Sequence, residues 1–208
     1  MHSTDIPDSD LCAAAREHAR ALSAPFLFNH VARTFAFAEA VGRHRGATYD
    51  RELLYLACVF HDRGLVESTP VETRFEVEGA DAARAFLAAR GVAEHAQEIV
   101  WDAIALHTTT VIPQRKRPEI ALCQMGAAVD VGYAPRALVP ARLVEEVLER
   151  YPRLNFKTAM TSAFCGLLRR NEAAAAASPI VADAGERAIE GFRRPHFCDV
   201  VAGAAYDE

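Results

Sequence analysis

The chain lacks the features that mark membrane and disulfide-stabilised proteins. No apolar run reaches the roughly 18 residues that a membrane span needs. The polar, acidic start has no basic segment followed by an apolar one, so we expect no secretory signal. The five cysteines are scattered and odd in number, without a Cys-x-x-Cys pair, which argues against a disulfide framework. We therefore expect a cytoplasmic protein with no membrane partner.

The chain also has few lysines, no net positive charge and few strand patterns. The net charge of −5 argues against a general nucleic-acid binder, which usually has a basic surface. The basic stretch Gln114-Arg115-Lys116-Arg117 is more typical of a solvated turn, although it leaves a local basic patch open. With 208 residues, 51% of them hydrophobic and 25% charged, the chain can bury a sizeable core. No internal repeat is visible.

Apolar residues recur at helical spacing along nearly the whole chain, which predicts an all-α, single-domain helical bundle. Residues 25–170 form its main part, residues 1–24 are an N-terminal extension or helix, and residues 171–208 are a C-terminal helix and tail of the same domain. Asp50 is a predicted N-cap, Gly91 ends a helix, and Pro118 begins one. The predicted helices are 11–22, 26–43, 51–60, 79–90, 92–107, 119–131, 140–150, 155–170 and 178–191.

Two histidines and two aspartates lie on or beside apolar helical segments in the order His30, His61, Asp62, Asp130. Imidazole nitrogen and carboxylate oxygen together suit one divalent ion, Zn, Fe, Mn or Ni. Neighbours on a regular helix point about 100° apart, but His61 and Asp62 fall where their helix ends and can therefore converge. Taken singly, each member has a plainer interpretation: a polar helix cap, a core histidine, or a surface carboxylate. As an ordered set they predict a metal site at the centre of the bundle.

Further polar residues follow the doublet. His107 ends an apolar helix just before Thr108, where it can bind substrate, relay protons or orient a ligand, unless it is a core histidine. Glu76 and Glu78 would share one side if their stretch is extended, and either could contact a bound water or Arg74. Solvated charges are the default interpretation for this glutamate pair.

The ordered set resembles the HD-domain superfamily of metal-dependent hydrolases over about residues 28–132. The flanking segments 26–30, 74–80 and 101–107 resemble its cyanamide-hydratase-like branch. The resemblance implies His30, His61, Asp62 and Asp130 as metal ligands, with Asp62 and His107 catalytic. We also expect substrate contacts from Arg63, which departs from the aliphatic residue that the family often has after the doublet, and from Glu76 and Thr108.

Two features of the sequence limit the number of metal ions and the class of substrate that we expect. Some HD proteins hold a second metal with extra histidines, but His95 and His107 are twelve positions apart and about 120° apart on one helix, so we expect one ion. Many HD phosphohydrolases carry a lysine where this chain has Leu65. A phosphate needs cationic partners, and Arg33, Arg63 and Arg74 could substitute for the missing lysine, so the phosphohydrolase is less favoured but stays open.

Three functions stay open at this point. The favoured one is a hydrolase or hydratase that acts on a small nitrile-like or amide-like substrate, as cyanamide hydratase does. The alternatives are an HD phosphohydrolase acting on a nucleotide or other phosphate ester, and a non-catalytic HD module that binds a ligand. The expected partner is a small-molecule substrate rather than nucleic acid, and a homo-oligomer stays open.

Overall fold

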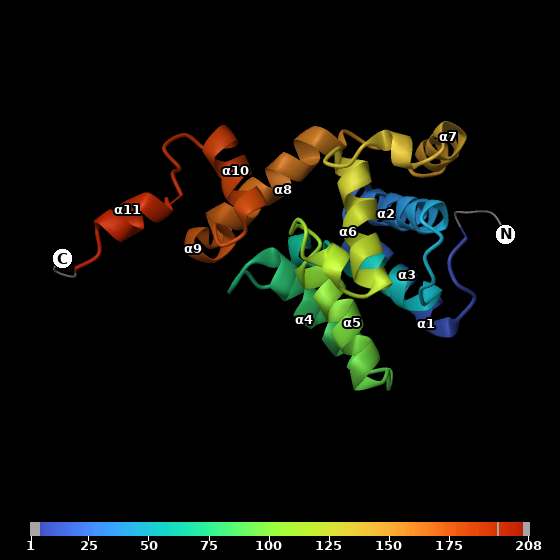
Figure 1. Ribbon diagram of the computed structural model, residues 1–208. Helices are drawn as coiled ribbons and strands as arrows, with labels where there is room; N and C mark the ends of the chain where they lie inside the picture. Colours follow the sequence, from blue (N-terminus) through green and yellow to red (C-terminus); the bar gives the residue numbers. More distant parts are fainter. Residues whose placement is uncertain (1–4, 195, 206–208) are drawn as a thin grey trace.

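The computed structural model describes residues 5–194 and 196–205. Residues 1–4, at the start of the predicted N-terminal extension, and residues 206–208, at the end of the predicted tail, lie outside the described part, as does residue 195. Within the described part every regular element is a helix, which confirms the predicted all-α fold (Figure 1). None of the described helices is long and apolar enough to cross a membrane.

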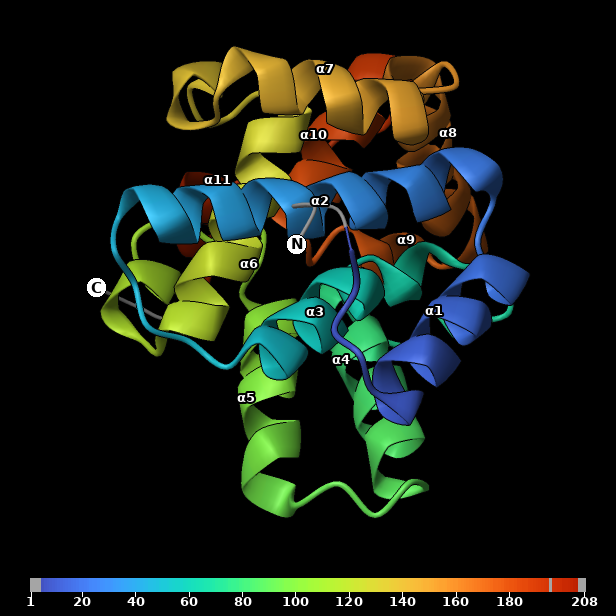
Figure 2. The ribbon, with the colours of Figure 1, turned by 90° about the vertical axis from the view of Figure 1, so that its right-hand side faces the viewer.

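The centre of the molecule is formed by α2 (Pro25–His44), α3 (Arg51–Phe60) and α6 (Pro118–Val131), which pack against one another. Helix α3 is apolar on all sides and is buried from Leu53 to Phe60. Asp50 caps it as predicted, because its carboxylate accepts hydrogen bonds from two backbone N–H groups of the first turn. Helix α1 (Asp10–Leu22) packs against α3 on the outside (Figure 2).

Helices α4 (Phe75–Ala88) and α5 (Glu94–Ala105) pack side by side below this centre in the view of Figure 1. Helix α4 begins four residues earlier than the predicted start at residue 79. Glu76 and Glu78 therefore lie in its first turn, where residues two positions apart point about 200° apart. The extended conformation that would place both on one side does not occur.

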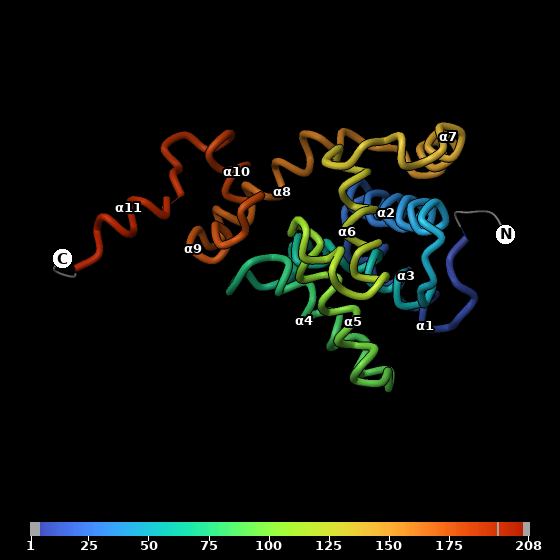
Figure 3. The backbone as a smooth tube through the Cα atoms, viewed as in Figure 1, coloured from blue at the N-terminus to red at the C-terminus, as the bar shows by residue number. Residues whose placement is uncertain are grey.

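Of the remaining helices, α7 packs on α2, and the helices after it lead away from the centre. The tube in Figure 3 shows the chain running from α8 through α10 to α11, which lies far from α1. The predicted helices of this part agree with the structure within three residues at each end, while α9 and α11 were not predicted as helices. The elements are α7 (Ala141–Arg150), α8 (Phe156–Arg170), α9 (Glu172–Ala175), α10 (Pro179–Ala188) and α11 (Phe197–Ala202), with 3-10 turns η1 (Arg63–Leu65), η2 (Pro113–Arg115) and η3 (Arg136–Leu138).

Two glycines allow the close approaches that position the polar residues. A Cβ on Gly126 would lie 2.3 Å from the backbone oxygen of Thr34, so α6 can contact the backbone of α2 only with glycine here. Asp130 lies one turn further along α6 and is brought against α2 by this contact. A Cβ on Gly64 would lie 1.9 Å from the backbone oxygen of Phe75, so η1 sits directly on the start of α4.

Candidate metal centre

The His61–Asp62 doublet sits where α3 ends. His61 keeps helical backbone angles (φ −57°, ψ −32°), whereas Asp62 has left the helix (φ −102°, ψ 18°) and leads into η1. This change of direction brings the two side chains together, with His61 Nε2 3.4 Å from Asp62 Oδ2. The position at a helix terminus therefore allows adjacent residues to reach one point, as the sequence predicts.

His30 completes a compact group from the first turns of α2. Its Nε2 lies 3.1 Å from His61 Nε2 and 3.3 Å from Asp62 Oδ2. All three residues are buried, and their ligand atoms lie within 4.8 Å of one another, as the ligands of a single ion would. The structure thus brings together three of the four predicted ligands.

The hydrogen bonds of the two rings leave lone pairs facing this point. His61 Nδ1 donates to the Cys58 backbone oxygen at 2.8 Å, and His30 Nδ1 donates to Asp130 Oδ2 at 2.6 Å. A neutral imidazole that donates through Nδ1 carries a lone pair on Nε2. Burial lowers the pKa of His61 to about 3, so its ring stays neutral.

The carboxylate between the two rings needs a positive partner. Asp62 Oδ2 is a buried oxygen without a hydrogen-bond partner among the described residues. The Nε2 atoms of His30 and His61 converge with this oxygen at one point, where a cation would satisfy all three. A divalent metal ion fits this donor set, and histidine rings oriented by outer hydrogen bonds are typical of metal sites.

His107 approaches the same carboxylate from the end of α5. Its Nδ1 donates to the Ile104 backbone oxygen at 2.6 Å, which leaves the Nε2 lone pair directed to the site, 3.5 Å from Asp62 Oδ1. The ring is buried and packs against the ring of His61 at a centroid distance of 4.8 Å. The sequence-based expectation of an active-site role for His107 therefore has a supporting geometry.

Asp130 lies on the other side of His30. Its Oδ1 accepts from Arg33 Nε at 2.7 Å and from Arg153 at 3.2 Å, and its Oδ2 accepts from His30 Nδ1. Burial alone would raise the pKa of Asp130, but the hydrogen bonds from His30 and Arg33 outweigh it and hold the pKa well below its usual range. Direct ligation by Asp130 stays a prediction, because its oxygens already have partners outside the group of three.

Of the residues predicted to contact substrate, one lines a cavity beside the metal-binding group and two do not. A cavity of about 540 Å³ opens beside the metal-binding group, and Thr108 and His107 line it. Arg63 and Glu76 do not line it: Arg63 donates to the Thr69 hydroxyl, and Glu76 is fully buried. The Glu76 carboxylate accepts from Thr108 at 2.6 Å, so its effect on the cavity is indirect.

Sequence reasoning missed the arginines behind the centre. Arg33 is fully buried three residues after His30, and both of its contacts with Asp130 are shorter than 3 Å. An arginine on an apolar helix, one turn after a predicted metal ligand, indicates that a buried acidic residue must pair with the arginine. Arg153 offered no comparable signal, because it follows α7 in a loop and reaches Asp130 only through the tertiary fold.

Comparison with known proteins agrees with this geometry. The HD domain family model matches residues 27–150, more than half of the chain. The chain therefore belongs to the HD domain family, whose members are in general metal-dependent hydrolases that bind divalent metals. No curated protein matches the chain.

Proposed function

We propose that the chain is a metal-dependent hydrolase or hydratase that adds water to an uncharged carbon–nitrogen group, a nitrile or an amide. The observation that carries this proposal is the combination of a cation-binding group with an adjoining cavity that has few available positive charges. His30, His61 and Asp62 converge at one end of that cavity. The ion would be Zn, Fe, Mn or Ni, since the donor set suits each of them.

The arginines that could receive a phosphate are already engaged elsewhere. Arg33 binds Asp130, Arg63 binds Thr69, and Arg74 binds Glu76 at 3.0 Å. Leu65, at the position where many HD phosphohydrolases have lysine, is buried. A phosphate dianion needs charged or bidentate partners, which these residues do not supply to the cavity.

The protein's own residues can position the reactants and move the proton. A divalent metal ion held by His30, His61 and Asp62 would lower the pKa of a water and polarise the substrate. In a hydration, the water oxygen bonds to the nitrile carbon, one carbon–nitrogen π bond breaks, and a proton is delivered to the nitrogen. The Nε2 lone pair of His107 can accept the water proton and pass it on. Asp62 Oδ1, 3.5 Å away, stabilises the transient imidazolium.

A metal-content measurement tests the first half of the proposal. Wild type purified without added metal should carry close to one ion per chain by elemental mass spectrometry, and Asp62→Asn should carry almost none. Asp102→Asn is the matched control, because Asp102 forms a surface ion pair with Lys116. Wild-type protein that binds no metal after reconstitution would contradict the proposal and favour a non-catalytic ligand-binding module.

A substrate comparison tests the second half. Metal-loaded wild type should release ammonia from amides or convert cyanamide and other nitriles to the corresponding amide products, and Asp62→Asn should not. The second candidate, a phosphohydrolase, is favoured by Arg153 and Lys157, which line the cavity. Phosphate release from a nucleotide panel, absent in Asp62→Asn and without nitrile or amide turnover, would replace the proposed chemistry by this candidate.

A further inference from the structure

The cavity beside the candidate metal centre is larger than a minimal nitrile needs. Its volume of about 540 Å³ lies within the range of roughly 300–1,000 Å³ that is typical of sites for drug-sized ligands. Cyanamide and acetonitrile have only a few heavy atoms and would leave most of this space to water. The cavity is continuous from His30, His61 and His107 to α10, so the extra volume adjoins the reacting atoms.

One wall of the cavity is an apolar stripe on α8 and α10. Phe156, Met160 and Phe164 recur every four residues along α8 and share one face. Ile180 and Ala184, also four residues apart, continue the wall on α10. The stripe begins at the metal-binding group itself, because the ring of Phe156 lies 4.9 Å from that of His30.

Apart from the metal-binding group, His107 and the solvent-exposed Lys157, the polar side chains of the cavity are uncharged or already paired. Gln124 pairs with Gln114 at 2.5 Å, and Thr108 donates to Glu76. Arg153, at the edge, is held by the carboxylate and backbone oxygen of Asp130. An apolar group placed along α8 would therefore displace water without leaving a buried charge unpaired.

We infer that the substrate carries a bulky apolar group, aromatic or branched aliphatic, which lies along Phe156, Met160 and Phe164 while its carbon–nitrogen group faces His30, His61, Asp62 and His107. This inference rests on the proposed function for the reacting group only. The wall lies at residues 156–184, outside the 27–150 segment that the family model matches. The apolar preference therefore belongs to this chain's own C-terminal helices. Met160 is unbranched and flexible, which suits a wall that adapts to different apolar shapes.

Ligand binding tests this inference without requiring turnover. Isothermal titration of metal-loaded wild type should show benzamide binding at least about 10-fold more tightly than acetamide, since an apolar extension that fills a pocket contributes about this much or more. Met160→Trp fills the wall and should remove that preference while acetamide binding stays within about twofold. Ala184→Phe, at a half-buried site on α10, is a second filling variant should Met160→Trp fail to fold.

Ser162→Trp is the matched control, because Ser162 is an exposed residue of α8 that does not line this cavity. It should retain the full preference for benzamide. Equal affinity for the two amides in wild type, or a preference that survives both filling variants, would overturn the inference. Tight benzamide binding without turnover of any amide or nitrile would support the apolar wall and contradict the proposed reaction. Turnover of cyanamide without any preference for benzamide would support the proposed reaction and contradict the apolar wall.

Discussion

The two walls of the cavity are built in opposite ways. On the side that belongs to the family match, buried polar groups hold one another: His30 is fixed by Asp130, and Asp130 by Arg33. On the side formed by α8 and α10, apolar side chains such as Met160 face the cavity. Hydrogen-bonded networks fix atoms in one arrangement, whereas apolar contacts are non-directional. Under the proposed function, the first wall would determine which atoms react and the second which molecules fit. We call them the reactive wall and the specificity wall.

The two regions are joined by a few polar contacts, one of them buried and the other exposed. Glu76, in the first turn of α4, accepts from the Ser178 hydroxyl at 2.8 Å just before α10. The Asn171 side chain donates to the Val71 backbone oxygen at 2.8 Å. These bonds, together with the contact between the rings of Phe156 and His30, fix how α8 and α10 sit beside the metal-binding group.

Breaking the Glu76 junction should have the largest effect on the folded state. Glu76→Ala leaves Arg74, Thr108 and Ser178 without their shared acceptor. We expect the free energy of unfolding, measured by urea denaturation, to fall by about 3 kcal/mol. Glu78→Ala is the control on the same turn; it removes only two loop hydrogen bonds and should cost about 1 kcal/mol. Equal losses in the two variants would mean that Glu76 does not join the regions.

The same junction predicts a dependence on acid. Burial alone would raise the pKa of Glu76, but Arg74, His107 and Thr108 bring it below its ordinary value of 4.5. A carboxyl whose pKa is lower in the folded state stabilises the fold above the unfolded pKa and loses that contribution as the pH falls. The stability gap between wild type and Glu76→Gln should therefore shrink below pH 4.5. A gap that widens on acidification would contradict the assigned ion pair.

The Asp130→Asn variant tests whether Asp130 orients His30 or binds the metal itself. If Asp130 orients His30 from behind, its loss should weaken metal binding by about 10–100-fold, as for other residues that support a ligand. Competition with a chromophoric chelator measures this, with Asp62→Asn as the reference for a lost ligand. Arg33→Met/Asp130→Asn is the charge-balanced control, because Arg33 would otherwise remain buried without its partner. Metal loss as complete as in Asp62→Asn would instead make Asp130 a direct ligand.

The reactive wall could be predicted from sequence far better than the specificity wall. The order of His30, His61 and Asp62 along the chain is recognisable in the sequence. The end of α3 explains how the adjacent residues His61 and Asp62 converge. The role of Asp130 could not be derived, because it depends on Arg33 reaching it across the α2–α6 contact. Met160 looks like any core residue of an amphipathic helix, and only the packing of α8 reveals that it faces a cavity.

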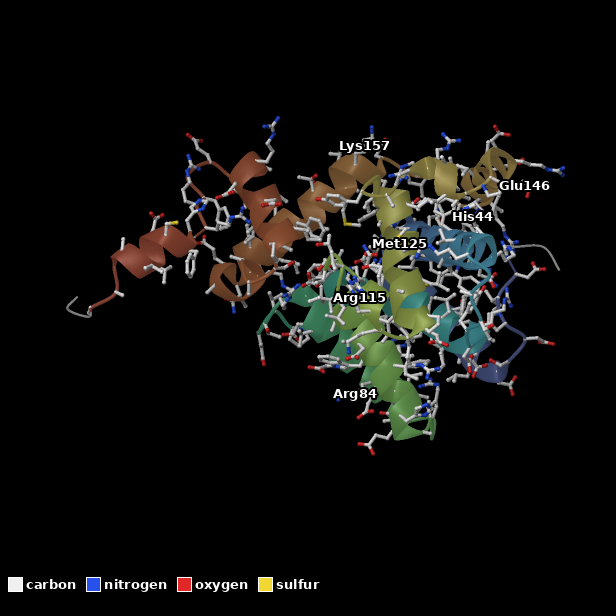
Figure 4. The ribbon with its side chains drawn as sticks, viewed as in Figure 1. His44, Arg84, Arg115, Met125, Glu146 and Lys157 are labelled. Atoms are coloured by element: carbon white, nitrogen blue, oxygen red, sulfur yellow. The ribbon has the colours of Figure 1, made fainter. Side chains whose placement is uncertain are left out.

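Substitution of Lys157 tests whether the wall formed by α8 and α10 recognises charge, and we expect its effect to be the smallest. Lys157 is one of the chain's two lysines and lies near the start of α8, where Figure 4 labels it on the upper surface. Because the side chain is exposed, its charge is screened by solvent. Lys157→Met should therefore change kcat/KM for an uncharged amide or nitrile by less than about twofold.

Lys116→Met is the control, since Lys116 pairs with Asp102 on the surface and does not line this cavity. A selective loss of about 10-fold or more for phosphate esters in Lys157→Met would mean that α8 receives an anion. In that case the wall formed by α8 and α10 would recognise charge as well as apolar shape. An unchanged profile in both lysine variants leaves recognition to the apolar stripe, with chemistry confined to the histidines and Asp62.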